Sequence, residues 1–288
     1  MFWRSSYRKM ETESTGHRLD VTMVNETKQI RSNSSDYDEA SGHYDFSRRA
    51  GRKTSKLLIE LLNPTKDTWV LDLGCGTGNF LSELSTISAK LLGLDISAGM
   101  LAQERAKTSR ATLILADGVA MPLQDRSFEA VYSILVIHHI SDKIKLMSEV
   151  YRILHRQGRF VIQSCSHEQL STFWFYHYFP RGLEIDRKRF PDFTELSAML
   201  MEVGFKDISI HPCPFEALFK ETPELYLDKS YRDGNSTFFF LTPEEIRQGC
   251  ERIKEDVSSG RAVEVVREFD QRAERTGGRV SFIRATKP

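Results

Sequence analysis

The chain has 288 residues, of which 40% are hydrophobic and 28% are charged, a composition typical of globular proteins. Basic and acidic residues number 40 each, so the formal net charge is zero and the basic surplus of a nucleic-acid-binding protein is missing. The length is enough for one large α/β domain, with or without an appended cap. The four cysteines form no Cys-x-x-Cys pair, and we therefore expect no metal site.

The sequence predicts a cytoplasmic protein with reduced thiols and no membrane span. It contains no apolar run of roughly 18 residues or more, which a spanning helix needs. The N-terminal segment carries acidic residues and lacks the apolar stretch of a secretory signal. Residues 1–35 are polar and without sustained periodicity, which predicts a mobile arm.

The middle of the chain alternates between helix and strand patterns. A helix with Leu58 and Leu62 on one face is predicted to end at Asn63-Pro64. Beyond it, apolar runs typical of buried strands occupy 69–74, 90–96, 111–117, part of 128–140 and 158–165, and helical patterns occupy 79–88, 98–109 and 142–155. This alternation predicts a mostly parallel sheet with helices on both faces.

The alternation stops after residue 165. An aromatic and irregular segment, 166–192, follows the fifth strand, where folds of this type carry a cap over the substrate. A helix over 193–205, a strand over 206–212, a mainly helical region over 214–276 and a terminal strand over 279–287 complete the chain. The helical region is either a second part of the cap or a surface for a homodimer.

A glycine turn follows the first strand and opens the next helix. Gly74, Gly76 and Gly78 form a Gly-x-Gly-x-Gly pattern, which lets the backbone approach a ligand closely. The dinucleotide fingerprint is not met because residue 79 is Asn, and no Gly-Lys-Ser/Thr follows as in a phosphate-binding loop. The pattern therefore favours another adenosine-bearing cofactor, the alternative being a tight turn that only packs helix on strand.

Carboxylates follow the next two strands. Asp95 ends the second strand, where an acidic residue is placed to accept both hydroxyls of a ribose. Asp117, before Gly118, ends the third strand and is placed for an exocyclic amine of adenine. The alternatives are a helix cap for Asp95, a role that Ser97 fills equally well, and an Asp-Gly turn for Asp117. Ligands bind at this edge of open α/β sheets, so we expect one common site.

Taken together, the motifs resemble a known family. The stretches "VLDLGCGTG", "LLGLDIS", "ADGVAMPLQDRSFEAVYSILVIHHI" and "SEVYRILHRQGRFVI" occur in the order found in class I S-adenosylmethionine-dependent methyltransferases, in the group of the ubiquinone and menaquinone biosynthesis methyltransferases. The resemblance runs from about Tyr37 to Val161 and more loosely to Phe205. One departure is "HRQGRF", where Gln157 replaces the first glycine of the family's Pro-Gly-Gly in a turn distant from the cofactor.

The resemblance implies a fold, a donor and a set of residues around it. The fold would be Rossmann-like, with a seven-stranded sheet, a mobile arm (1–35), a core with an N-terminal lid helix (36–165), and a C-terminal part with the cap, the remaining strands and a helical region (166–288). S-adenosylmethionine would be the cofactor. Its binding residues would be Tyr44, Arg48, Asp72, Gly74, Cys75, Gly76, Gly78, Asp95, Ile96, Met100, Asp117, Gly118 and Ser133.

The expected reaction is methyl transfer to O, N, S or C of a small molecule, mainly by proximity and orientation. His138 and His139 follow the fourth strand, and His138 is the preferred candidate for the general base. The alternative is a His that is structural or contacts the cofactor. The aromatic run 173–179 favours a flat or apolar acceptor, unless its rings pack into a core. A tRNA or protein methyltransferase and a non-catalytic S-adenosylmethionine sensor are the alternatives, whereas the cysteine pattern speaks against metalloid chemistry.

Overall fold

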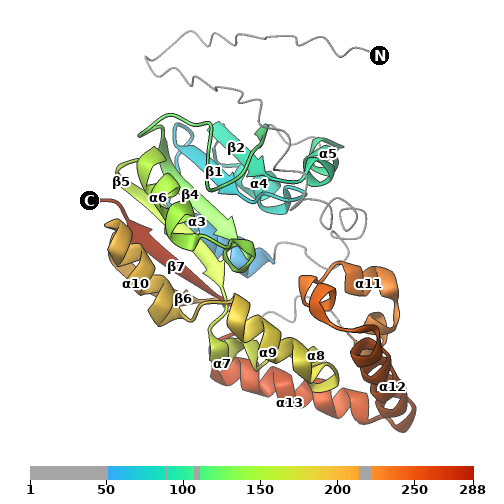
Figure 1. Ribbon diagram of the computed structural model, residues 1–288. Helices are drawn as coiled ribbons and strands as arrows, with labels where there is room; N and C mark the ends of the chain where they lie inside the picture. Colours follow the sequence, from blue (N-terminus) through green and yellow to red (C-terminus); the bar gives the residue numbers. More distant parts are fainter. Residues whose placement is uncertain (1–50, 89, 107–110, 214–221) are drawn as a thin grey trace, which may run out of the picture.

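The computed structural model describes residues 51–88, 90–106, 111–213 and 222–288 (Figure 1). Its centre is a seven-stranded sheet with the strand order β3-β2-β1-β4-β5-β7-β6. The strands are β1 (Trp69–Leu73), β2 (Lys90–Asp95), β3 (Thr112–Leu115), β4 (Phe128–Ile134), β5 (Leu154–Ser164), β6 (Lys206–Pro212) and β7 (Ser281–Thr286). The pairs from β3 through β5 are parallel, and β7 runs antiparallel to both of its neighbours. The predicted Rossmann-like, mostly parallel sheet is confirmed.

Helices cover both faces of the sheet, as the alternating pattern predicts. They are α3 (Arg52–Leu62), α4 (Asn79–Leu84) and α5 (Ala98–Ala106) on one face, and α6 (Lys143–Ile153) and α10 (Phe193–Val203) on the other. Each face has its own apolar core, which explains why buried residues follow one another along the central strands rather than alternating with exposed ones. Helix α3 ends at Asn63, whose left-handed backbone precedes Pro64.

The segment expected to be irregular, 166–192, is helical. It forms α7 (His167–Leu170), α8 (Phe175–Tyr178) and α9 (Pro180–Arg189). Local signals explain the helices, because Ser166 and Gln169 form a capping box and Pro180 occupies the first turn of α9. The cap is completed by η2 (Pro223–Leu227), α11 (Lys229–Asp233), η3 (Ser236–Phe240), α12 (Pro243–Ser259) and α13 (Arg261–Arg275), which gather at one end of the sheet (Figure 1).

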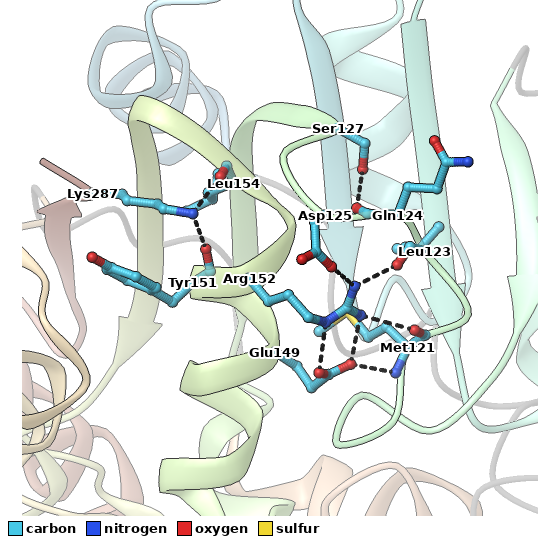
Figure 2. A network of polar contacts seen from close by, with 10 residues as sticks. All are labelled: Met121, Leu123, Gln124, Asp125, Ser127, Glu149, Tyr151, Arg152, Leu154 and Lys287. Atoms are coloured by element: carbon cyan, nitrogen blue, oxygen red, sulfur yellow. Dashed lines mark hydrogen bonds and ion pairs between the residues drawn. The ribbon is translucent and has the colours of Figure 1, made fainter. Parts of the chain in front are cut away.

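Arg152, near the end of α6, fixes the long connection from β3 to β4. Figure 2 shows its guanidinium between Glu149, Asp125 and two backbone carbonyls of the connection. Glu149 also accepts from the backbone N–H of Met121 at 2.9 Å. The hydrogen bond from Arg152 is the main reason that the pKa of Glu149 lies below its usual range. The network thereby restrains the segment that begins at Asp117.

The last residues of the chain close the same end of α6. The ammonium of Lys287 donates to the carbonyl oxygens of Tyr151 and Leu154 at 2.6 and 2.8 Å (Figure 2). Gln157 has a left-handed backbone with φ 63°, and its N–H donates to the carbonyl of Lys287 at 2.7 Å. The departure from the family's glycine, which was expected in a turn, therefore falls within β5, where the residue after the terminal strand holds its backbone. Among the described residues, no helix has the length and apolar character of a membrane span.

Candidate functional site

The glycine turn after β1 is packed on both sides. Its three glycines all have positive φ angles, 75° at Gly74, 53° at Gly76 and 77° at Gly78. A Cβ at Gly74 would lie 2.4 Å from a methyl of Val136, and one at Gly78 would lie 2.2 Å from Cγ of Glu104. At Gly74 and Gly78 both the backbone conformation and the lack of space therefore require glycine. The turn is tight, and its ligand is left to be identified.

Asp95 connects the turn to the end of β2. Its Oδ2 accepts from the N–H of Gly76 at 2.8 Å and its Oδ1 accepts from the N–H of Ser97 at 2.9 Å. The hydroxyl of Ser97 accepts from the N–H of Met100 at 3.1 Å, so Ser97 caps α5 as expected. Asp95 is thus a half-buried carboxylate at the sheet edge whose orientation is fixed by two backbone donors.

Asp117 and Gly118 lie at the end of β3. The carboxylate of Asp117 accepts from the N–H of Val119 at 3.0 Å, the turn-forming role that was considered as the alternative. A Cβ at Gly118 would lie 2.7 Å from a terminal methyl of Leu146, so a larger residue at this position would require the Leu146 side chain to shift. The backbone joins Asp117 to the rest of the site, because the N–H of Ala116 donates to the carbonyl of Asp95 at 3.0 Å.

Asp72 is the buried acid of the site. Only 3% of its surface is exposed, and its Oδ2 accepts from the hydroxyl of Tyr132 at 2.7 Å. Burial is the main reason that the pKa of Asp72 is raised to about 8. The hydrogen bond from Tyr132 opposes this rise, and the nearby Asp95 and Glu104 add to it. Without a cation nearby, this carboxyl is therefore protonated over much of the neutral range.

Two other predicted residues, Cys75 and Ser133, are also buried. Burial, followed by the charges of Asp72, Asp95 and Glu104, raises the pKa of the Cys75 thiol well above its usual range. A thiol held in this form is a poor nucleophile and a poor metal ligand. The hydroxyl oxygen of Ser133 on β4 is buried and has no hydrogen-bond partner among the described residues.

The turn after β4 joins the core to the cap. Leu135 has a left-handed backbone with φ 52°, and its side chain packs against the apolar cluster of the cap. The ring of His138 is buried and stacks on Phe190 with centroids 3.8 Å apart and an interplanar angle of 14°. Arg189, in the last turn of α9, reaches within 3.3 Å of Nδ1 of His139. The candidate base therefore belongs to a ring stack between core and cap.

The aromatic residues of the cap pack mainly against one another. Trp174, Phe175, Tyr178 and Phe179 are buried in one cluster with rings from distant parts of the chain. Phe175, for example, stacks on Tyr226 at 5.7 Å and 11°. The run that was expected to line the acceptor space or to fill a core thus does the second. Within the described ranges, no group of three His, Cys, Asp or Glu side chains could hold a metal ion.

The remaining predicted cofactor residues lie either outside the described part of the chain or near Asp95. Tyr44 and Arg48 lie outside the described residues. Ile96, directly after Asp95, is half-buried, and Met100, in the first turn of α5, is buried. Sequence reasoning missed Tyr132, Glu104 and Val136. The position of Glu104, three and four residues after Leu101 and Met100, was the one signal that it faces inward, since both of these are buried.

Comparisons with known proteins identify the family. The family model described as a methyltransferase domain matches residues 71–162. A malonyl-[acyl-carrier protein] O-methyltransferase of Marinomonas sp. is 30% identical over 184 residues, which cover 58% of this chain and 68% of that protein. This chain belongs to the class I S-adenosylmethionine-dependent methyltransferases. It is therefore an enzyme whose methyl donor is S-adenosylmethionine.

Other similar proteins differ in how much of their length is matched. The Yersinia pestis malonyl-[acyl-carrier protein] O-methyltransferase is 31% identical over 42% of this chain, and the match spans 46% of that protein. The Bacillus licheniformis demethylmenaquinone methyltransferase is 25% identical over 61% of this chain and 86% of its own length. Among solved structures, a proposed methyltransferase from an antibiotic biosynthesis pathway of Anabaena variabilis aligns with a TM-score of 0.70 at 26% identity, over 83% of this chain and 99% of that one.

The residues of the site fit the donor of this family. The glycine turn leaves space only for backbone, the Ser133 hydroxyl lacks a partner among the described residues, and Asp72 is a buried acid whose charged form a cation would stabilise. These features suit a ligand with a cationic amino-acid part. The residue-by-residue assignment remains a prediction, in which Asp72 and the glycines hold the methionine part, Asp95 the ribose, and Asp117 the adenine.

Proposed function

We propose that this methyltransferase acts on a small-molecule acceptor that binds between the turn after β4 and the cap. The observation that carries the proposal is the contact between these two parts. Leu135 packs into the cap cluster, and Arg189 of the cap donates to His139 of the turn. Cys165, at the end of β5, belongs to the same cluster. A covered edge of this kind favours a small acceptor over a folded RNA or protein.

The neutral overall charge also supports this choice. A tRNA methyltransferase needs a basic surface for phosphates, whereas this chain has equal numbers of acidic and basic residues. The printed names of relatives include acceptors such as malonyl-[acyl-carrier protein] and demethylmenaquinone. We propose a flat or apolar metabolite such as a quinone, because the malonyl group of the other relative is an anionic acyl group attached to a carrier protein. The proposal rests on these relatives and not on the cap aromatics, because those rings pack on one another.

Catalysis in such a site depends mainly on alignment. S-adenosylmethionine supplies a methyl group that is already activated by its sulfonium. The chain must then hold the acceptor in line and exclude water, and orientation of this type is worth roughly 7–11 kcal/mol of barrier in well-aligned systems. The strained turn at Leu135, fixed by a hydrogen bond from its N–H to the Gln163 carbonyl at 3.1 Å, supplies a rigid wall for this purpose.

His138 is the proposed base for an acceptor that carries a proton. Its ring is buried beside His139, with centroids 3.9 Å apart. Nδ1 of His139 accepts a hydrogen bond from Arg189, so a neutral His139 carries its proton on Nε2 and is suited to donate rather than to accept there. This arrangement favours His138 over His139 as the base. Separate His138→Asn and His139→Asn variants should differ, with only the first losing the acidic limb of the pH–rate profile.

The test of the acceptor class is product formation with a panel of acceptors. Release of S-adenosylhomocysteine should be measured with a short-chain demethylmenaquinone, a malonyl thioester, unmodified tRNA and a mixed protein substrate, each also with an Asp95→Ala control. Turnover with a small molecule, abolished in the control, supports the proposal. Turnover with tRNA or protein alone would replace it with the macromolecular alternative, and donor binding without any turnover would favour a sensor.

A further inference from the structure

Glu104 on α5 is a buried carboxylate that the expected reaction does not use. Only 1% of its surface is exposed, and its Oε1 has no hydrogen-bond partner among the described residues. No ion pair is found for it within this part of the chain. Glutamate is almost never fully buried unless it is paired, because removing a charge from water is costly. An apolar residue would pack here at lower cost, so the acid calls for an explanation.

Glu104 lies directly behind the donor turn. Its Cγ, Cδ and Oε1 would be 2.2, 3.1 and 3.0 Å from a Cβ placed on Gly78, so the side chain fills the space that this glycine leaves. Its charge also reaches the site, because it contributes to the raised pKa values of Asp72 and of the Cys75 thiol. The other charged group that acts on both is Asp95. The turn is thus surrounded by three acids from β1, β2 and α5.

The donor and its product differ in charge at one atom. S-adenosylmethionine carries a sulfonium, an ammonium and a carboxylate, whereas S-adenosylhomocysteine has a neutral sulfur and the same two other groups. A fixed negative charge in a poorly solvated site therefore stabilises the donor more than the product. Asp72 and Asp95 are engaged by a hydroxyl and by backbone N–H groups, while Glu104 keeps an unpaired oxygen.

We propose that Glu104 is a selectivity residue of the donor site, whose buried carboxylate favours the cationic donor over the neutral-sulfur product. It acts through space and not by contact with the reacting atoms. The consequence for turnover is weaker retention of S-adenosylhomocysteine and thus faster product release. The proposal rests on the donor binding at the glycine turn, and it adds the reason why this chain has an acid behind that turn.

The test compares ligand affinities in a charge-neutral variant. Isothermal titration calorimetry should give dissociation constants of S-adenosylmethionine, S-adenosylhomocysteine and sinefungin, whose amine replaces the sulfonium charge, for wild type and Glu104→Gln. We expect the preference for the two cationic ligands over S-adenosylhomocysteine to fall about tenfold, the order that removal of one partly shielded charge gives. Glu83→Gln, an exposed acid on α4, is the matched control and should leave the preference unchanged.

Several outcomes would overturn the proposal. Equal weakening of all three ligands means that Glu104 only supports the shape of the turn, and unchanged affinities mean that Glu104 does not act on the bound ligands. Glu104→Met keeps the length of the side chain and should change the ligand preference as Glu104→Gln does. If one of the two variants does not fold, the other still tests the proposal. Failure of wild type to bind any of the three ligands would instead refute the donor assignment.

Discussion

The buried acid Asp72 makes a specific prediction about stability and pH. Its pKa is raised from 3.8 to about 8 in the folded chain, chiefly by burial. In the unfolded chain the carboxyl is solvated and loses its proton near pH 4. The folded state therefore binds one proton more than the unfolded state between about pH 4 and pH 8. The stability that this proton provides is complete below the unfolded value and is lost as pH rises through the folded value.

The size of the effect follows from the shift. A difference of roughly four pKa units, at about 1.4 kcal/mol each, gives about 6 kcal/mol as the upper limit of the stability lost across this range. Asp72→Asn removes the titration and keeps an oxygen that can accept the Tyr132 hydroxyl. The free energy of unfolding of Asp72→Asn should therefore fall less between pH 5 and pH 8 than that of wild type.

Urea unfolding at half-unit steps of pH measures this difference. Asp67→Asn, at an exposed acid, is the control and should keep the wild-type slope. Parallel pH profiles for wild type and Asp72→Asn would refute the raised pKa.

The same reasoning predicts that binding of the cationic donor releases a proton near pH 7, because a nearby ammonium stabilises the charged Asp72. Calorimetry in buffers of different ionisation enthalpy detects that proton.

Three further predictions concern the turn and its supports. Asp95→Ala should weaken donor binding at least tenfold, which equilibrium dialysis measures, and an unchanged affinity would contradict the placement of the ribose. Gly78→Ala should lower the free energy of unfolding by ~2 kcal/mol or more, since it combines a left-handed φ with the clash on Glu104. Gly260→Ala has a similar φ and open space, so it should cost only ~1 kcal/mol, and equal losses would show that the clash is absent. Arg152→Met should lower the free energy of unfolding by ~1–3 kcal/mol and weaken donor binding, because it loosens the β3–β4 connection. The control Arg247→Met, on exposed α12, should change neither quantity. Thermal unfolding measures the stability, and calorimetry measures the donor affinity.

The sheet and the gathering of glycines and acids at one of its edges could be predicted because their signals are local. Apolar runs mark the strands, and glycines or acids at the ends of parallel strands meet at one edge wherever the strands pair. The partnership of Asp72 with Tyr132 could not be predicted this way. The two residues are 60 positions apart and become neighbours only through the register of β1 against β4.

The cap shows the opposite case, because its sequence pattern is strong but is compatible with two different structures. An aromatic run such as 173–179 suits a ligand cavity and a packed core equally well. The packed core forms because residues distant in the sequence, Tyr226, Phe238 and Phe269, supply the surfaces on which these rings pack. Glu104 could not be predicted as buried for a related reason, because an amphipathic helix pattern assigns charged residues to the exposed face.

Hydrogen exchange on the wild-type chain, with and without S-adenosylhomocysteine, tests the central claim that the donor binds at the carboxyl ends of β1, β2 and β3. The amides of 74–78, 95–100 and 117–119 should gain protection together, because all three segments contact one ligand. The amides of the cap helices should gain less protection. Protection confined to the cap, or no protection at the glycine turn despite measured binding, would contradict the account.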